Sequence, residues 1–294
     1  MVKNPYSKVV IIYNPNSTGS SKANAKKLQQ ELKESLSIPV TLTPTSHAGH
    51  GEEIAEKLAR SNQRIVLVSS SGDGGYNEVI NGVLNVPNSK LVTHVLPSGN
   101  ANDHHHATTK GSSAERIAGA HETAIDVIKV SGTKDGKPWQ RYAHSYVGIG
   151  LTAYVGKRLT EATLNPLNEK LIVLKYVALF RHVTIRIQGK KRRYTSLVFG
   201  SVDRMSKVLK LRGTKSLGDG KMEVYEIRER NTLQTFLTLI GGSTAGFSPS
   251  MRTDLFSFRT VRATEIQLDG EVFKLDADTD VTVTCHKQAL KIIR

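Results

Sequence analysis

The residues best suited to chemistry lie in Ser69–Asn81, with the sequence SSSGDGGYNEVIN. An apolar run, Ile65–Val68, leads into this stretch, and apolar residues at helical spacing, Val79–Leu84, lead out of it, which predicts strand, glycine turn and helix. The start of such a helix exposes backbone N–H groups that attract anions, and glycines at 72, 74 and 75 let a phosphate approach closely. Asp73 would repel a bare phosphate, so the stretch favours a metal–nucleotide complex. Taken alone, it also fits an ordinary α/β connection.

The preceding and following segments would position this turn within a parallel sheet. Apolar runs that predict strands occupy residues 9–13, 40–42, 65–68 and 91–96. Helical stripes separate them, at residues 25–36 and 52–59 among others. Strands that alternate with helices predict an α/β domain, residues 1–125, with a parallel sheet and flanking helices. The strand-to-helix loops would then meet at the carboxyl edge of the sheet, where such folds bind ligands.

The pattern changes near residue 125 from helical to alternating. Val183–Ile187 alternates apolar and polar residues, and further segments of this kind begin near residues 196, 222, 261 and 281. Helices are predicted at 168–180 and 233–240. We therefore expect residues 126–294 to form a mainly antiparallel β domain, whose last residues pack back on the first domain.

Charge and composition restrict the class of protein. The chain has 294 residues, one cysteine and a formal net charge of +15. Residues 126–294 hold 29 Lys and Arg against 16 Asp and Glu, which predicts an anionic partner such as a phospholipid surface. No apolar run is long enough for a membrane span or a signal peptide, so we expect a cytoplasmic protein. The single cysteine excludes an internal disulfide and a cysteine-based zinc cluster.

Several other patterns have ordinary interpretations. Gly148–Ala153 nominally fits a dinucleotide motif, but we interpret it as a close-packed turn. The triplet His104–His106 is interpreted as surface histidines, because adjacent residues on a helix point in different directions. Asp219-Gly220 and Asp269-Gly270 are either hairpin turns or carboxylates presented to a cleft between the domains.

Together, four segments resemble the catalytic family of diacylglycerol kinases, which includes bacterial lipid kinases and sphingosine kinases. The segments are Asn14-Pro15-Asn16-Ser17, Gly72–Gly82, Pro97–Asp103 and Leu268–Glu271. They are similar, in order and spacing, to the family's N-P-x-S/G, G-G-D-G-T-x-N-E-V-x-N-G, P-x-G-T-x-N-D and D-G-E motifs. The sequence departs from the family at Ser71, Gly75 and Asn100, where the motifs have Gly, Thr and Thr.

The resemblance implies an ATP-dependent lipid kinase that binds ATP in the first domain and lipid in the second, with phosphoryl transfer in the cleft. It implies nucleotide contacts from Asn14, Pro15, Asn16, Ser17, Thr45, Gly72, Asp73, Gly74, Gly75, Tyr76, Asn77, Glu78 and Asn100. Asp73 would help to hold Mg²⁺–ATP, and Glu271 would be the general base that takes the proton of the lipid hydroxyl. A structural Mg²⁺ site would lie at Ser216, Asp219 and Lys221. Diacylglycerol or a similar lipid is the expected acceptor, and the basic second domain would hold the enzyme peripherally at an anionic membrane.

Other functions stay open at this point. A non-catalytic homologue that binds lipid or nucleotide would explain the three departures, and a kinase of a soluble acceptor such as NAD would share the glycine turn. We expect no nucleic-acid partner, because the basic stretch Arg181–Lys215 holds few aromatic residues for stacking, Tyr194 and Phe199. A homodimer is left open.

Overall fold

The computed structural model describes residues 4–17, 20–161, 175–180, 182–205, 209–213, 216–229 and 231–294. The chain forms two compact units. The first comprises residues 1–126 together with residues 288–294, and the second comprises residues 127–287. The seven C-terminal residues therefore belong to the unit formed by the start of the chain.

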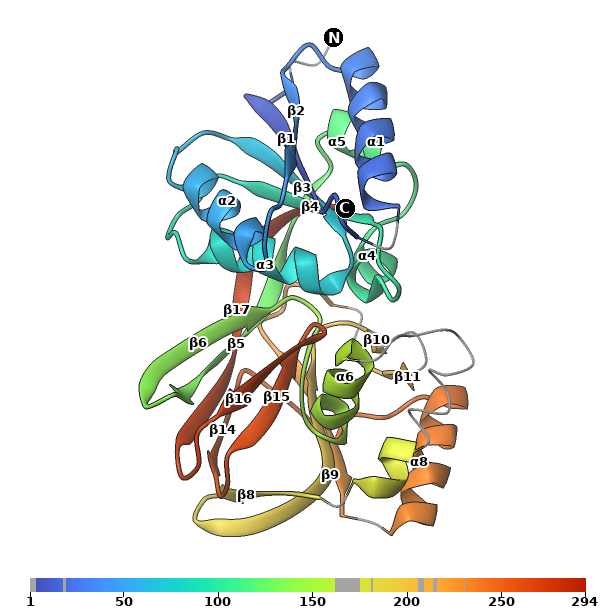
Figure 1. Cartoon of the computed structure of the whole chain (residues 1–294), viewed down its shortest axis with the longest axis vertical. Coiled ribbons are helices and arrows are strands. Elements are labelled where there is room, and N and C mark those ends of the chain that lie inside the picture. Colours follow the sequence, from blue (N-terminus) through green and yellow to red (C-terminus); the bar gives the residue numbers. More distant parts are fainter. Residues whose placement is uncertain are drawn as a thin grey trace. The chain divides into compact units, whose positions relative to one another are not determined.

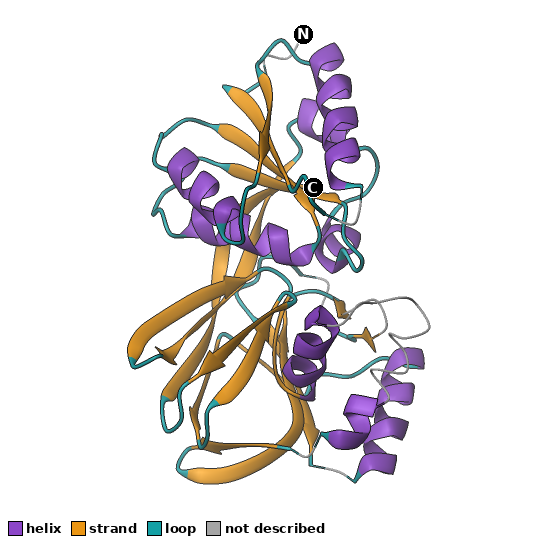
Figure 2. Cartoon of the chain, viewed as in Figure 1, coloured by secondary structure: helices purple, strands orange, loops and turns teal. Residues whose placement is uncertain are grey.

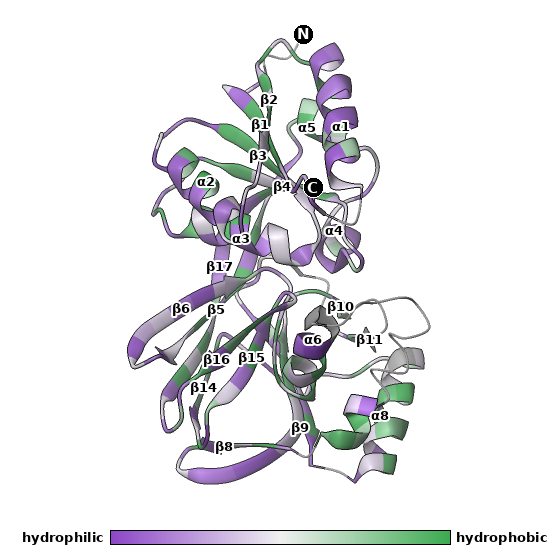
Figure 3. Ribbon diagram, viewed as in Figure 1, coloured by the Kyte–Doolittle hydropathy of each residue, from purple (hydrophilic) through white to green (hydrophobic). Residues whose placement is uncertain are grey.

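The first unit contains a parallel sheet with the strand order β2–β1–β3–β4–β17 (Figure 1). Its strands are β1 (Lys8–Tyr13), β2 (Val40–Pro44), β3 (Ile65–Ser71), β4 (Val92–Pro97) and the end of β17 (Asp280–Ile293). The central strands carry apolar, β-branched runs such as KVVIIY and IVLVSSS, because both faces of the sheet are buried (Figure 3). The α/β fold predicted for this part of the chain is confirmed.

Helices cover both faces of this sheet. They are α1 (Ser21–Ser35), α2 (His50–Ala59), α3 (Asp73–Leu84), α4 (Asp103–Thr108) and α5 (Ser113–Ala118). Helices α1 and α5 lie on one face, and α2 and α3 lie on the other (Figure 1). The α1 stripe predicted from the sequence, which includes Leu28 and Leu32, is buried against Val9, Ile11 and Val66.

The second unit is dominated by antiparallel strands (Figure 2). Its main sheet has the order β16–β15–β7–β9–β8–β14–β17, with β12 pairing to β9 and β13, and β5 pairing to β6 and β17. The strands are β5 (Glu122–Lys134), β6 (Lys137–Ala143), β7 (Tyr146–Gly150), β8 (Val183–Ile187), β9 (Lys190–Gly200), β12 (Met222–Arg228), β13 (Met251–Thr253), β14 (Leu255–Thr260), β15 (Thr264–Leu268) and β16 (Glu271–Leu275). A separate two-stranded sheet pairs β10 (Arg204–Met205) with β11 (Leu209–Lys210). The prediction of a mainly antiparallel second region is confirmed.

Two helices of the second unit are α6 (Leu151–Glu161) and α8 (Thr232–Thr244). Gly148–Ala153, interpreted above as a turn, instead ends β7 and begins α6, with Gly150 at φ +85°. The close packing is present, since a Cβ on Gly150 would lie 2.5 Å from the carbonyl oxygen of Thr195, but the segment after Gly150 is helical and is not a turn. Most of the helix predicted at 168–180 lies outside the described residues. The described part of that range includes residues 175–179, which are helical. Among the described residues, no helix has the length and apolar character needed to cross a bilayer.

Candidate active site

The strands of the first unit end in register. Tyr13 pairs with Pro44 of β2 and with Ser70 of β3, and Ser71 pairs with Pro97 of β4. The loops that follow these four strands therefore leave the sheet at one edge. This register brings together the predicted nucleotide segments, which begin at Asn14, Thr45, Gly72 and Ser98.

The loop after β1 is an exposed turn that the neighbouring segments hold in place. The side chain of Asn14 accepts a hydrogen bond from the N–H of Asn16 at 2.9 Å, as Asn commonly does in turns. The N–H of Asn14 donates to Ser21 Oγ, and that hydroxyl donates in turn to the carbonyl of Ser70. Thr45 donates its N–H to the carbonyl of Tyr13 at 2.9 Å. The side chains of Asn14 and Asn16 remain exposed at the edge.

Two of the loops approach each other at their glycines. A Cβ on Gly99 would lie 2.3 Å from Gly72 Cα, so both loops require glycine at this contact. Ser98 N–H donates to the carbonyl of Ser71 at 3.0 Å, which joins the same two loops. The backbones after β3 and β4 thus form one continuous surface.

Ser71 and Gly75 lie close together in space, a relation that was not predicted from the sequence. A Cβ on Gly75 would lie 2.7 Å from Ser71 Cβ and 2.9 Å from Ser71 Oγ. Ser71 Oγ contacts Ser69 Oγ at 2.7 Å and donates to the carbonyl of Gly72 at 3.0 Å. The side chain of Ser71 therefore fills the space that a side chain at position 75 would need. The two departures from the family motif compensate each other in volume.

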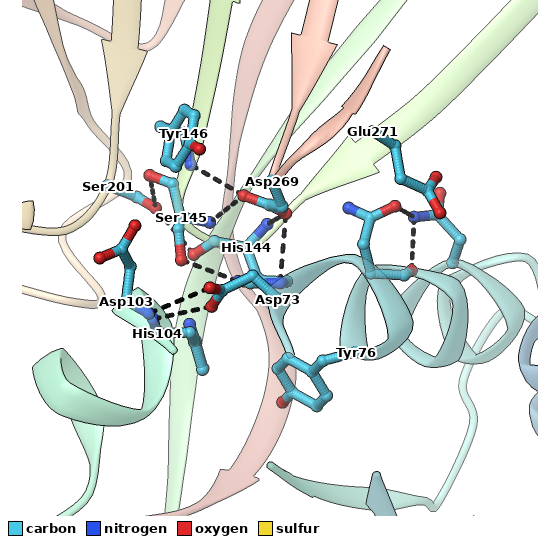
Figure 4. A network of polar contacts seen from close by, with 12 residues as sticks. Asp73, Tyr76, Asp103, His104, His144, Ser145, Tyr146, Ser201, Asp269 and Glu271 are labelled. Carbon is cyan, nitrogen blue, oxygen red and sulfur yellow. Dashed lines mark hydrogen bonds and ion pairs between the residues drawn. The ribbon is translucent and has the colours of Figure 1, made fainter. Parts of the chain in front are cut away.

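Asp73 begins α3, and its carboxylate faces the start of α4 (Figure 4). Its two oxygens accept hydrogen bonds from the N–H groups of Asp103 at 3.1 Å and His104 at 3.2 Å. Asn102, with φ +53°, holds the same loop by exchanging hydrogen bonds with the backbone of Gly99. Asp73 is half-buried, and its oxygens are of the kind that Mg²⁺ prefers, so it fits a role in holding Mg²⁺–ATP.

The remaining residues of the α3 motif act mainly inside the unit. Tyr76 is fully buried and its hydroxyl contacts Thr93 Oγ1 at 2.8 Å, while Asn77 accepts hydrogen bonds from Asn81. Glu78 accepts hydrogen bonds from the N–H groups of Gly49 and Gly51 at 2.8 and 3.1 Å, so it anchors the start of α2. Nucleotide contacts from Tyr76 would have to come from its backbone. The roles predicted for these residues stay predictions.

The histidine triplet differs from its interpretation. His104 is buried and its ring packs on Tyr76 at a centroid distance of 5.1 Å, whereas His106 is exposed. Burial also lowers the pKa of His105, whose ring contacts the carbonyl of Val95. The interpretation as surface histidines was wrong for His104, because the short helix α4 turns its first residues inward. Asn100 is exposed at the same edge, as a nucleotide contact requires.

In the second unit, Asp269 is a fully buried carboxylate (Figure 4). It accepts hydrogen bonds from the N–H groups of three consecutive residues, His144 at 2.7 Å, Ser145 at 3.0 Å and Tyr146 at 2.9 Å. His144 Nε2 lies 3.3 Å from the same carboxylate. Asp269 and Gly270, at φ +48° and +102°, form the hairpin between β15 and β16. The hairpin interpretation is thus confirmed for Asp269-Gly270. The carboxylate of Asp269 also holds residues 144–146, which lead into β7.

Glu271 follows this hairpin as the first residue of β16. Its carboxylate lies 3.2 Å from the guanidinium of Arg141 and is partly exposed. It lines a pocket of about 400 Å³ within the second unit, together with Lys157, Glu265, Gly270, Val272, Phe273 and Lys274. A carboxylate at the wall of a pocket that also offers lysines can receive a proton from an acceptor hydroxyl.

Asp219 lies in a bent segment before β12, which is not a hairpin. Its carboxylate accepts the N–H of Lys221 at 3.0 Å and is paired with Arg252. Burial opposes ionisation, but hydrogen bonds from Ser216, Lys221 and Arg252 outweigh it and lower the pKa of Asp219. A guanidinium already supplies the positive charge here, and Lys221 presents its N–H to the carboxylate. This arrangement does not fit the predicted metal site.

The second unit also holds a large cavity, of about 1630 Å³. Its wall combines apolar side chains, among them Val183, Met251, Leu255 and Phe256, with a cationic group. The cationic residues are Lys191, Arg192, Arg193, Arg228, Arg262 and Lys274, which outnumber the two carboxylates of the wall, Glu226 and Glu265. An amphiphilic ligand with a polar or anionic end matches such a lining.

No structural role in these arrangements was predicted from the sequence for two residues, Asp269 and Asn102. Asp269 was considered as a turn residue or as a carboxylate presented to a cleft, whereas its carboxylate binds the N–H groups of the distant segment 144–146. Asn102 holds the loop after β4, and its position directly before Asp103 at the start of a helix is a local signal that identifies it.

Comparisons with known proteins agree with this architecture. The model of the family described as diacylglycerol kinase catalytic domain matches residues 8–130. A crystal structure of a diacylglycerol kinase from Bacillus anthracis str. Sterne matches with a TM-score of 0.72 and 18% identity, covering 99% of this chain and 98% of that chain. A yeast NADH kinase complexed with NADH matches with a TM-score of 0.54 and 10% identity, covering 99% of this chain and 83% of that chain. No curated protein sequence matches. The resemblance stated from the sequence is therefore confirmed: residues 8–130 carry the diacylglycerol kinase catalytic domain, within a chain that has the fold of a solved diacylglycerol kinase.

Proposed function

We propose that the protein is an ATP-dependent lipid kinase that phosphorylates the hydroxyl of diacylglycerol or a similar lipid. The observation that carries this proposal is the common edge of the sheet from which the loops after β1, β2, β3 and β4 leave. Asp73, at the start of α3, lies at this edge. The kinase catalytic domain matched over residues 8–130 contains the whole of that edge.

The nucleotide would bind along this edge as its Mg²⁺ complex. Backbone N–H groups at the start of α3 favour phosphate oxygens, and the contact between Gly72 and Gly99 keeps side chains away from them. Mg²⁺ neutralises charge on the phosphates during transfer. Asp73, held in one orientation by the N–H groups of Asp103 and His104, would keep the metal complex in register.

The acceptor would come from the second unit. The apolar and cationic lining of its large cavity supports a lipid, and the pocket beside Glu271 supports this residue as the general base. Asp269 would not touch the acceptor. It fixes the hairpin that carries Glu271, and so acts as a positioning residue. Access to such an acceptor would require peripheral association with a membrane from the cytoplasm.

A kinase assay with γ-labelled ATP, Mg²⁺ and a panel of acceptors tests the proposal. The panel contains diacylglycerol, monoacylglycerol, sphingosine and ceramide in detergent micelles, with NAD as a soluble acceptor. We expect label in the organic phase for at least one lipid. Glu271→Gln should lower kcat by about 10²- to 10⁴-fold, as expected for a lost general base.

Glu265→Gln is the matched control, because Glu265 lines the same pocket and pairs with Lys157 at 2.8 Å. It should keep most of the activity. Label only in the aqueous product would identify a kinase of a soluble acceptor. Nucleotide binding without any turnover would identify a non-catalytic homologue, and equal activity of Glu271→Gln and the wild type would refute the assigned base.

A further inference from the structure

Helix α8 presents four large apolar side chains to solvent. The exposed fractions are 68% for Leu233, 38% for Phe236, 59% for Leu237 and 46% for Ile240. These positions follow the spacing i, i+3, i+4 and i+7, so they share one face. Thr235, in contrast, is 4% exposed. A helix that only stabilised the unit would place the leucines inside and the threonine outside.

The stretch of sequence that forms α8 contains no acidic residue, and exposed basic residues lie near both of its ends. No Asp or Glu occurs between Glu229 and Asp254, a stretch that contains the whole helix. Exposed Arg228 ends β12 three residues before Asn231, whose side chain caps α8. At the other end, exposed Arg212 donates its N–H to the carbonyl of Phe247, whose ring packs on Gly242 of α8. An arginine therefore lies near each end of the apolar face, and the adjacent carboxylate of Glu229 is paired with His182 and Arg193.

We propose that the exposed face of α8, formed by Leu233, Phe236, Leu237 and Ile240, is a docking surface for an anionic phospholipid bilayer. The four apolar side chains would enter the acyl region, while Arg212 and Arg228 would remain at the headgroups. An uncharged apolar face flanked by basic residues is the arrangement that binds a helix parallel to a membrane surface. In Figure 3, α8 carries several hydrophobic segments with paler ones between them.

The charge distribution favours a bilayer over a second copy of this chain as the occupant. Two copies joined through α8 would bring four basic ends together, since each contributes Arg212 and Arg228 with no acidic residue on the helix. An anionic bilayer instead satisfies both the apolar face and its cationic ends. The proposal deepens the proposed function by naming the surface that would bring the enzyme to its acceptor.

Vesicle sedimentation without ATP or acceptor tests this surface directly. The probes are vesicles of phosphatidylcholine with 30% phosphatidylglycerol, and vesicles of phosphatidylcholine alone. We expect binding to the first, weaker binding to the second, and a decrease in binding when the salt is raised from 0.1 M to 0.5 M. The double variant Leu233→Gln/Leu237→Gln should lower the partition coefficient by about tenfold or more per leucine. Thr232→Gln, at another exposed position of α8, should bind as the wild type does.

A fluorescent label shows which face is buried. Cys285 is the only cysteine, so Cys285→Ser combined with Leu237→Cys allows an environment-sensitive dye to be placed on α8. Its emission should shift to the blue on the anionic vesicles. The same dye at Lys27→Cys, on exposed α1 of the first unit, should not respond.

The outcomes separate this proposal from the kinase assignment. Absence of binding to anionic vesicles, or binding without any response of the dye at position 237, would overturn the docking surface even if the enzyme phosphorylates lipids in micelles. A change from dimer to monomer in the double variant, with vesicle binding unchanged, would also overturn it and identify a contact between copies. Binding through α8 by a protein that has no kinase activity would uphold the surface and refute the enzyme. Because the substituted leucines are exposed, the unfolding temperature of the double variant should equal that of the wild type.

Discussion

Asp73 and Asp269 are both followed by glycine, and both accept hydrogen bonds from consecutive backbone N–H groups of another segment. Their exposure differs. Asp73 is half-buried at the start of a helix, whereas Asp269 is fully buried in the turn of a hairpin. A carboxylate that keeps some access to solvent can also serve a ligand, and one that has none can serve only the fold.

Asp219 adds a third case of the same dipeptide, because its carboxylate is paired with Arg252 near the surface. Identical Asp-Gly pairs thus have three different surroundings: the start of a helix, three consecutive N–H groups at the junction of β6 and β7, and a guanidinium. The comparison teaches that the partner and the exposure of an aspartate decide its role, while the dipeptide itself determines only the turn.

The largest effect is expected for the buried carboxylate. Asp269→Ala leaves the N–H groups of residues 144–146 without this acceptor, and each such loss costs about 1–3 kcal/mol. The free energy of unfolding of the second unit should fall by at least about 3 kcal/mol, measured by urea denaturation. Asp269→Asn, which keeps one acceptor oxygen, should lose less. Equal stability of Asp269→Ala and the wild type would remove the contrast with Asp73.

Asp73→Asn should have the opposite signature. The amide oxygen can still accept an N–H group from the start of α4, so the free energy of unfolding should change by less than about 1 kcal/mol. Phosphoryl transfer should fall by about 10²-fold or more, because the negative charge beside Mg²⁺–ATP is lost. Steady-state kinetics and thermal unfolding of the same preparation measure both quantities. Full activity of this variant would show that Asp73, like Asp269, serves only the fold.

Alanine substitutions at Gly75, in the first turn of α3, and at Gly270, in the β15–β16 hairpin, should destabilise the protein for different reasons. Gly75→Ala should destabilise the first unit by about 1–3 kcal/mol through overlap with the side chain of Ser71. In a Ser71→Gly background the same change should instead stabilise α3, by up to about 1 kcal/mol, because alanine favours a helix. Gly270→Ala has open space around its Cβ but φ of +102°, so its cost is conformational.

A double-mutant cycle measures this difference. The coupling between positions 71 and 75 should exceed about 1 kcal/mol, since the two side chains would occupy one volume. Independent, additive effects at 71 and 75 would show that the overlap is relieved by movement of the backbone.

The smallest effect concerns Asp219. Arg252→Gln should cost about 0.5–1 kcal/mol, because both members of this ion pair are partly exposed. The pKa of Asp219 is lowered in the folded protein, so its contribution to stability is present above the pKa of the unfolded carboxyl, near 4, and is lost as the pH falls through the folded value. This acid-sensitive part should be reduced in Arg252→Gln. EDTA should leave the unfolding temperature of the wild type unchanged. A decrease that is absent in an Asp219→Asn variant would show that a metal, and not Arg252, neutralises Asp219.

Local patterns were sufficient to predict the first unit. Its strands are uniform apolar runs such as KVVIIY, and its helices have clear stripes such as Leu28 and Leu32, because each element is buried in a regular way. The register at Tyr13, Pro44 and Ser70 then follows from parallel pairing. The glycine motifs could be placed at the sheet edge for this reason.

Features that depend on distant segments could not be predicted in the same way. Glu78 lies in a motif that predicts nucleotide contacts. Its carboxylate instead accepts hydrogen bonds from the N–H groups of Gly49 and Gly51, nearly 30 residues away in the sequence. His104 looked exposed because its helix is polar, and its packing on Tyr76 involves another element. The stripe of α8 was recognised as a helix, but periodicity alone does not say whether a stripe faces a core or solvent.

The C-terminal segment that completes the first sheet affects how the protein can be made. Ile292 pairs with Thr93, and the carbonyl of Ile293 contacts the ring of His94 at 3.2 Å. During synthesis, the ribosome therefore releases residues 1–126 long before their outer strand exists. Until then β4 presents an open edge, so the catalytic domain can reach its finished form only after the second unit has been translated.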